Sequence, residues 1–213
     1  MKIEVNHVSK TINKTLILDD ITLSLEGGKI YGLQGPNGSG KTMFLRLLAG
    51  LIRPSSGEVL IDGTKLGVDC DFPSSMGLLI ENPAFLPNYT GIGNLELLAD
   101  LQGKVDKNQI HDTLQRVGLN PNDSRKYRKY SLGMKQRLGI AAAIMERPDL
   151  ILIDEPTNAL DDDGIKQVCE IMRQERARGA LIIFACHDAE IVRDLSDEVL
   201  KVNAGHIERK SGI

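Results

Sequence analysis

The chain has 213 residues, of which 41% are hydrophobic and 26% charged, a balance that is typical of a folded domain and excludes a disordered chain. A net charge of −3 and an aromatic content of 4% without tryptophan argue against a nucleic-acid-binding protein. The sequence shows no apolar run of the roughly 18 residues that a membrane span requires, no signal peptide and no closely spaced cysteine pair.

The first third of the chain has the pattern of short strands joined by turns. Ile21, Leu23 and Leu25 alternate with polar neighbours, which is the period of a half-buried strand. The apolar segments 30–34 and 59–62 are bounded by glycines and predict two further strands. This part of the chain therefore predicts a small β region near the N-terminus.

Helices are predicted in the middle of the chain. Residues 92–101 and 108–117 carry apolar side chains at helical spacing. A third helix should begin at Ser131, a residue type favoured at helix N-caps, and end before Pro148. These helices interrupt the β-rich pattern and indicate an insertion.

The last third of the chain alternates strands with a helix. The continuous apolar runs 150–153 and 181–185 are typical of parallel strands buried on both faces, and 163–178 predicts the helix that connects them. We therefore predict an α/β protein with a mostly parallel sheet, an N-terminal antiparallel β portion and an inserted helical subdomain. The expected segments are 1–81 and 137–213 for the α/β core and 82–136 for the helical subdomain.

A glycine-rich segment follows the predicted strand 30–34 and precedes an apolar helical segment. It reads GPNGSGKT and matches the pattern GxxxxGK[ST], in which glycines let backbone N–H groups and a helix N-terminus face phosphates. Lys41 would reach the β- and γ-phosphates, and the Thr42 hydroxyl would bind Mg²⁺. The alternative, a glycine-rich turn that fits by chance, is disfavoured by this strand–loop–helix setting. The predicted phosphate-binding residues are Gly35, Pro36, Asn37, Gly38, Ser39, Gly40, Lys41 and Thr42.

Two acidic residues follow the apolar run 150–153, where α/β sheets place ligand chemistry. Asp154 would hold Mg²⁺, and Glu155 could act as the general base for a water molecule in line with the γ-phosphate. His187 ends the next apolar strand and is expected beside them, although a lone histidine after a strand is more often structural. A solvated acidic turn is the alternative for the acidic pair.

These motifs occur in one order along the chain. GPNGSGKT lies at 35–42, YSLGMKQR at 130–137, LILIDEPT at 150–157, NALD at 158–161, and His187-Asp188 after the last predicted strand. The combination resembles the ATP-binding cassette of ABC transporters over residues 2–210. The resemblance implies a P-loop NTPase core, an inserted helical subdomain, and ATP with Mg²⁺ as ligands.

The resemblance also implies partners and further site residues. Ser131 and Gly133 lie in the signature segment, which in this family contacts the γ-phosphate held by a second ATP-binding subunit in a head-to-tail dimer, expected here to be a homodimer. His187 corresponds to the switch histidine that orients the γ-phosphate and the attacking water. The resemblance thus implies an ATPase that drives a separate transmembrane permease from the cytoplasmic face of the cell membrane.

The signature segment and the position of Glu81 depart from the family pattern. Leu132 and Met134 stand where glycine and glutamine are usual, although the Ser131 hydroxyl and the Gly133 backbone remain. Glu81 replaces the glutamine that usually touches Mg²⁺ and the membrane partner. A carboxylate is also a hard oxygen ligand, so we expect Glu81 at the Mg²⁺ site.

The adenine-binding position departs as well. Ile12 stands where the family has an aromatic residue that stacks on adenine, so base stacking is expected to be missing. If this register is wrong, Tyr31 or Tyr89 would cover the base instead.

Two segments resemble one branch of the family. LIENPAFLPNYTG and YSLGMKQRLGIA are similar to the bacitracin- and lantibiotic-type exporters, whose members export or confer immunity to peptide antibiotics. We expect the additional C-terminal region that such members often carry to be absent. Phe85, Leu86 and Tyr89 are candidate permease contacts, unless they only pack the helical subdomain.

Two other functions stay open at this stage. One is a soluble cassette ATPase that acts on nucleic acid or ribosomes; its one supporting feature is the basic run at 125–129, for which a solvated loop is the favoured interpretation. The other is a regulatory module that senses nucleotide without hydrolysing it, against which Glu155 and His187 argue.

Overall fold

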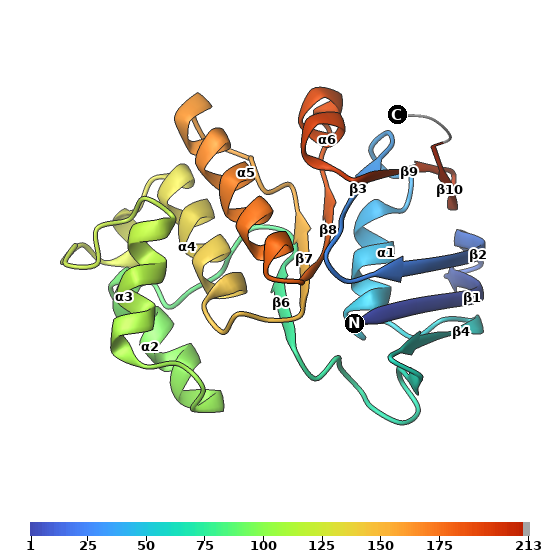
Figure 1. Ribbon diagram of the computed structural model, residues 1–213, viewed down its shortest axis with the longest axis horizontal. Coiled ribbons are helices and arrows are strands. Elements are labelled where there is room, and N and C mark those ends of the chain that lie inside the picture. The colour runs from blue at the N-terminus through green and yellow to red at the C-terminus, as the bar shows by residue number, and fades with distance from the viewer. Residues whose placement is uncertain (211–213) are drawn as a thin grey trace.

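The computed structural model describes residues 1–210, so the last three residues of the expected core segment 137–213 lie outside the described residues. Its strands form two sheets (Figure 1). The N-terminal sheet is antiparallel with the order β2-β1-β4-β5, which confirms the predicted antiparallel portion. Its strands are β1 (Lys2–Ile12), β2 (Thr15–Glu26), β4 (Ser56–Ile61) and β5 (Thr64–Lys65).

The second sheet has the order β10-β9-β3-β8-β7-β6, in which five strands are parallel and the edge strand β10 is antiparallel. Because β8 lies between β3 and β7, the ends of these three strands bring together the phosphate loop, the acidic pair and His187. The sequence analysis did not foresee β9 and β10. The strands are β3 (Ile30–Gln34), β6 (Met76–Leu79), β7 (Leu150–Asp154), β8 (Leu181–Ala185), β9 (Glu198–Asn203) and β10 (His206–Arg209).

The parallel sheet is covered on both faces, which explains its continuous apolar strands. In β7, Leu150 and Leu152 join the hydrophobic cluster that contains α1 (Lys41–Leu48), whereas Ile151 and Ile153 join the cluster that contains the other helices. Helix α1 lies between the two sheets (Figure 1). The helix that follows the phosphate loop therefore has most of its apolar side chains buried between the two sheets, which fixes the position of its N-terminus.

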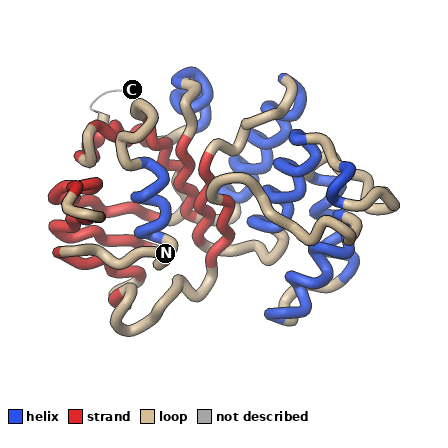
Figure 2. Tube along the Cα trace, turned by 180° about the vertical axis from the view of Figure 1, so that it is seen from behind, coloured by secondary structure: helices blue, strands red, loops and turns tan. Residues whose placement is uncertain are grey.

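The helices of the middle segment gather at one end of the molecule, opposite the antiparallel sheet (Figure 2). The predicted boundary at residue 136 falls inside one continuous helix, α4, whose apolar residues share a cluster with the parallel sheet. None of the helices within residues 1–210 is long and apolar enough to cross a membrane. The helices are α2 (Gly91–Gln102), α3 (Lys107–Arg116), α4 (Leu132–Ile144), α5 (Asp162–Ala177) and α6 (Ala189–Leu195), with a 3-10 turn at Tyr127–Lys129.

Side-chain caps determine where several helices begin. The Ser131 hydroxyl accepts a hydrogen bond from the backbone N–H of Met134 and caps α4, as the sequence predicted. Asp106 forms a capping box with Gln109 at the start of α3. Local sequence thus specifies these helix starts without help from distant residues.

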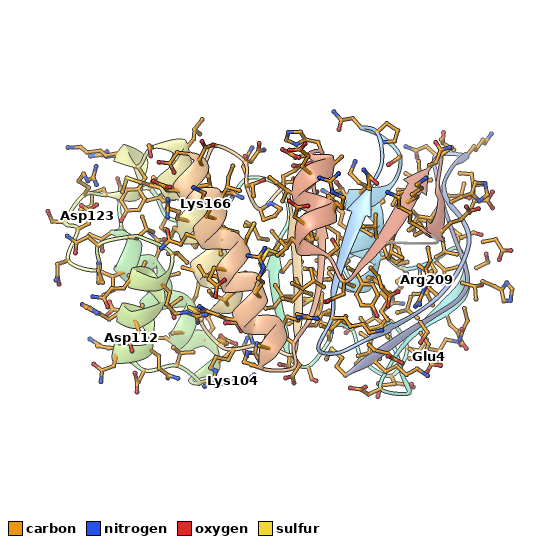
Figure 3. All side chains as sticks on the ribbon, turned by 45° about the horizontal axis from the view of Figure 1, so that its top comes forward. Glu4, Lys104, Asp112, Asp123, Lys166 and Arg209 are labelled. Atoms are coloured by element: carbon orange, nitrogen blue, oxygen red, sulfur yellow. The ribbon has the colours of Figure 1, made fainter. Side chains whose placement is uncertain are left out.

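Charged side chains extend from both ends of the molecule (Figure 3). Asp112 and Lys166 lie on the helical end, while Glu4 and Arg209 lie near the antiparallel sheet. In the basic run 125–129, the Arg125 guanidinium pairs with Asp123 at 2.7 Å, which neutralises part of its charge.

Candidate functional site

The phosphate loop connects β3 to α1 at the carboxyl end of the parallel strands (Figure 1). Gly40 has φ of 112°, a backbone conformation that L side chains rarely adopt, so glycine is required there. The buried Lys41 ammonium donates to the carbonyl oxygens of Gly35 at 2.7 Å and Pro36 at 3.1 Å. These bonds fold the lysine back over its own loop, where an anion would meet it.

The Ser39 hydroxyl supports the same interpretation. It is buried and has no hydrogen-bond partner among the described residues. A buried polar group without a partner is costly, and a phosphate oxygen would satisfy it. The loop therefore has an unsatisfied donor where the sequence pattern predicts a phosphate.

A pocket of about 390 Å³ lies against this loop and the acidic pair. It brings together most of the predicted phosphate-binding residues with both acidic residues and two apolar side chains, Ile17 and Met43, that the sequence analysis did not select as site residues. The lining residues are Ile17, Asn37, Gly38, Gly40, Lys41, Thr42, Met43, Asp154 and Glu155.

Thr42 and Asp154 form the candidate metal site. The Thr42 hydroxyl donates to Oδ2 of Asp154 at 2.6 Å, which places two oxygen ligands side by side. Burial raises the pKa of Asp154, and the hydrogen bond from Thr42 partly offsets this. Mg²⁺ is commonly held by one or two protein oxygens together with phosphates, so this donor set fits the ion.

Glu155 and His187 form a hydrogen-bonded pair beside the metal site. Nδ1 of His187 lies 2.8 Å from Oε2 of Glu155, and the backbone N–H of His187 lies 3.4 Å from the same oxygen. A carboxylate only accepts hydrogen bonds, so this contact requires a proton on Nδ1 of His187. Glu155 has φ of 52°, in the left-handed region that residues other than glycine seldom adopt.

The signature residues do not line this pocket within residues 1–210 of a single copy. Gly133 lies at the start of α4, and a Cβ there would come within 2.7 Å of the Ala159 carbonyl oxygen, so the close approach requires glycine. Ser131 is exposed, and neighbouring Leu132 is 72% exposed although it is apolar. These residues therefore form a separate surface.

Glu81 lies outside the phosphate pocket among the described residues. Its carboxylate pairs with the Arg46 guanidinium, and both line a second groove of about 410 Å³. Phe85 also lines this groove and packs edge-on against Tyr127 with ring centroids 5.4 Å apart. The groove is otherwise mostly apolar, and its remaining lining residues are Leu51, Leu78, Leu79, Ile80, Pro83, Leu98, Gly139 and Ala142.

The candidates for the adenine site have different positions. Ile12 ends β1 and is partly exposed, but within residues 1–210 it does not line the phosphate pocket, whereas Ile17 does. Tyr31 is fully buried and its hydroxyl accepts from the backbone N–H of Glu26. Tyr89 is exposed and lies just before helix α2. The sequence did not single out Ile17, which lies in the strand after the one that contains Ile12. The β1–β2 hairpin determines which of the two side chains faces the phosphate loop.

Sequence reasoning also missed Gln136. This buried residue lies in α4, and its side chain contacts the segment that carries Glu155. It stands inside the quoted signature segment, yet nothing in the local pattern distinguishes it from other polar helix residues.

A family model described as "ABC transporter" matches residues 18–158, more than half of the chain. The chain belongs to the ABC transporter family. Within this family it is an ATP-binding subunit with ATPase activity.

Relatives extend over almost all of the chain. An ABC transporter ATP-binding protein of Bacillus subtilis, YybJ, is 49% identical over 97% of this chain and 94% of its own length. The bacitracin transport ATP-binding protein BcrA of Enterococcus faecalis is 37% identical over 99% of this chain and 69% of its own length. The lantibiotic transport ATP-binding protein SrtF of Streptococcus pyogenes is 33% identical over 96% of this chain and 88% of its own length. The predicted resemblance to the bacitracin and lantibiotic branch is confirmed.

The fold agrees with this placement. A solved ATP-binding subunit of an ABC transporter superposes with a TM-score of 0.89 and 26% identity, covering 99% of this chain and 90% of the other. The predicted ABC-type α/β architecture is thereby confirmed.

Proposed function

We propose that this ABC ATPase drives the export of a peptide antibiotic, or immunity to one, through a separate transmembrane permease. The observation that carries this proposal is the similarity to BcrA and SrtF over nearly the whole chain. Because the chain itself offers no membrane-spanning helix within residues 1–210, transport would require a membrane partner. The chain would then work at the cytoplasmic face of the membrane.

The proposed hydrolytic chemistry follows from the pocket. Lys41, Ser39 and the loop N–H groups would hold the phosphates of ATP, with Thr42 and Asp154 as the Mg²⁺ ligands. The ion, when bound, would neutralise charge on the phosphate oxygens. Glu155 would accept the proton of the attacking water, and His187 would hold the Glu155 carboxylate in place through its 2.8 Å contact.

A second copy of the chain is proposed to complete the site. Ser131 and Gly133 lie apart from the pocket in one copy, yet Ser131 caps a helix N-terminus, where anions bind favourably. Its Oγ accepts the capping bond, so its O–H remains free to donate to a phosphate. The exposed Leu132 would be covered in such a head-to-tail homodimer. The helical subdomain at 82–136 would thus carry the signature segment to the partner site.

The groove beside Glu81 is the proposed permease site. It combines apolar walls with the Arg46–Glu81 ion pair, which suits an amphipathic helix at the membrane surface. Leu86 and Tyr89 are exposed near it, whereas Phe85 packs partly within the protein. Arg46 belongs to α1, the helix that begins at the phosphate loop, so the ion pair links the two sites. Glu81 could exchange Arg46 for Mg²⁺ when nucleotide binds.

The test is to purify the chain from native membranes, identify the copurifying permease and reconstitute both in lipid vesicles. Bacitracin or a lantibiotic should then stimulate ATP turnover, and cells that express the pair should resist that peptide. The matched control is Lys41→Ala, which should abolish both effects because nucleotide binding is lost. Peptide-independent turnover without a membrane partner would instead favour a soluble ATPase, and ATP binding without turnover would favour a nucleotide-sensing module.

A further inference from the structure

Gln136 connects the signature helix to the residue that follows strand β7. Its side chain is buried in the second turn of α4. The Nε2 amide donates to the carbonyl oxygen of Glu155 at 2.8 Å and to that of Pro156 at 3.2 Å. Both N–H groups of one amide are therefore used on two consecutive carbonyls of the catalytic segment.

The backbone at Glu155 requires such support. Its φ of 52° lies in a sparsely populated region, which persists only where surrounding contacts maintain it. The N–H of Glu155 donates to the carbonyl of Ala185 in β8 at 2.8 Å, which restrains one side of the residue. Gln136 and the N–H of Asn158 bond its carbonyl on the other side. The direction of the Glu155 carboxylate depends on this backbone, because the Cα–Cβ bond is fixed by φ and ψ.

Helix α4 contacts the same segment at two further points. The Gly133 backbone approaches Ala159, as its missing Cβ allows. The Arg137 guanidinium lies 3.6 Å from the Asp161 carboxylate. The helix that begins with the signature residues therefore spans the whole segment from Glu155 to Asp161.

We propose that Gln136 is a positioning residue for ATP hydrolysis, which directs the Glu155 carboxylate through the Glu155 and Pro156 carbonyls and ties that direction to the position of the signature helix. This inference rests on the proposed role of Glu155 as the base. Gln136 touches no reacting atom. Its effect is on the geometry of proton transfer, so it should change kcat and leave ATP binding unchanged.

The first test is Gln136→Met, which keeps the volume of the side chain and removes both donors. We expect kcat to fall by about tenfold to a hundredfold, since small displacements of a catalytic group have effects of this size. The KM for ATP should be unchanged, because the phosphate loop is not altered. The matched control is Gln174→Met, which removes an exposed amide of α5 that donates to the Glu170 carboxylate at 3.3 Å and should leave kcat unchanged.

The second test is a double-mutant cycle with Glu155→Gln. If Gln136 acts through Glu155, adding Gln136→Met to Glu155→Gln should change the residual turnover by no more than about twofold. A full multiplicative loss would overturn the proposal, as would normal kcat in Gln136→Met. High turnover in Glu155→Gln would overturn the base assignment itself, so the two failures are distinguishable. If Gln136→Met does not fold, Gln136→Asn keeps the amide but shortens its reach, and the same cycle applies.

Discussion

Replacing Glu155 by Gln tests the proposed base with little disturbance of the structure. Glutamine has the same shape, and its amide oxygen can still accept from Nδ1 of His187 across the 2.8 Å contact. The backbone bonds to Ala185 and Gln136 use only main-chain atoms of residue 155 and should stay intact. The substitution therefore isolates the ability to accept a proton.

The expected loss follows from this isolation. General-base catalysis contributes about 10²- to 10⁴-fold, so turnover should fall by that factor. At about 1.36 kcal/mol for each factor of ten, the barrier rises by about 2.7–5.4 kcal/mol. ATP binding should survive, because no group that holds the phosphates has changed. The protein with bound ATP should then accumulate as a dimer.

The measurement combines phosphate release, ATP titration and size-exclusion chromatography with and without ATP. Glu190→Gln is the matched control, since it neutralises an exposed acid of α6 that does not line the pocket. Its turnover should match that of the wild type. If Glu155→Gln keeps turnover within about threefold of the wild type, well short of the 10²-fold expected of a base, another group accepts the proton.

Three further predictions concern the metal site, the groove and the base pocket. Asp154→Asn should stabilise the nucleotide-free protein at pH 7 in EDTA. Burial raises the pKa of Asp154 in the folded state above its unfolded value of 3.8, so the folded state binds more protons between these two pKa values. The stability of the wild type therefore falls as pH rises through that window, and asparagine, which carries no charge, avoids this loss. The gain in melting temperature over the wild type should shrink as pH approaches 3.8, and a constant or reversed difference would contradict this. Glu81→Gln should lower the free energy of unfolding by no more than about 1 kcal/mol, because its ion pair with Arg46 is largely exposed. Peptide-stimulated ATP turnover should drop, while the affinity for ATP stays unchanged. Normal peptide-stimulated turnover in this variant would show that Glu81 has no role in coupling to the permease. Ile17→Ala should weaken the binding of ATP and of GTP by the same factor, about tenfold, because the apolar contact with the nucleotide is lost. Titrations that show unchanged affinity for both nucleotides in Ile17→Ala would place the base elsewhere.

Much of the fold followed from local patterns. The apolar runs of β7 and β8 predicted parallel strands because each strand is covered on both faces. Ser131 predicted the start of α4 because a cap is a contact between residues three positions apart. The strands β9 and β10 escaped prediction, since their mixed polar and apolar residues lie near the sheet edge.

The phosphate loop could be predicted because its chemistry is contiguous. Eight consecutive residues specify a turn, a helix N-terminus and the Lys41 and Thr42 side chains, and no distant contact is needed to define them. The order of the motifs likewise identified the family. Each motif consists of consecutive residues, so the sequence alone shows both the motifs and their order along the chain. Asp154, which follows an apolar strand, belongs to the same class of prediction.

Contacts between distant segments were decided only by the tertiary structure. Glu81 pairs with Arg46, 35 positions away, and Gln136 bonds the Glu155 carbonyl across 19 positions. Ile17 rather than Ile12 faces the loop because of the β1–β2 hairpin register. The sequence alone determined which chemical groups this protein carries and the local backbone that presents them. Which of those groups come into contact depends on how the sheets and helices pack. Packing energy is shared among many residues, so no single position in the sequence reveals these contacts.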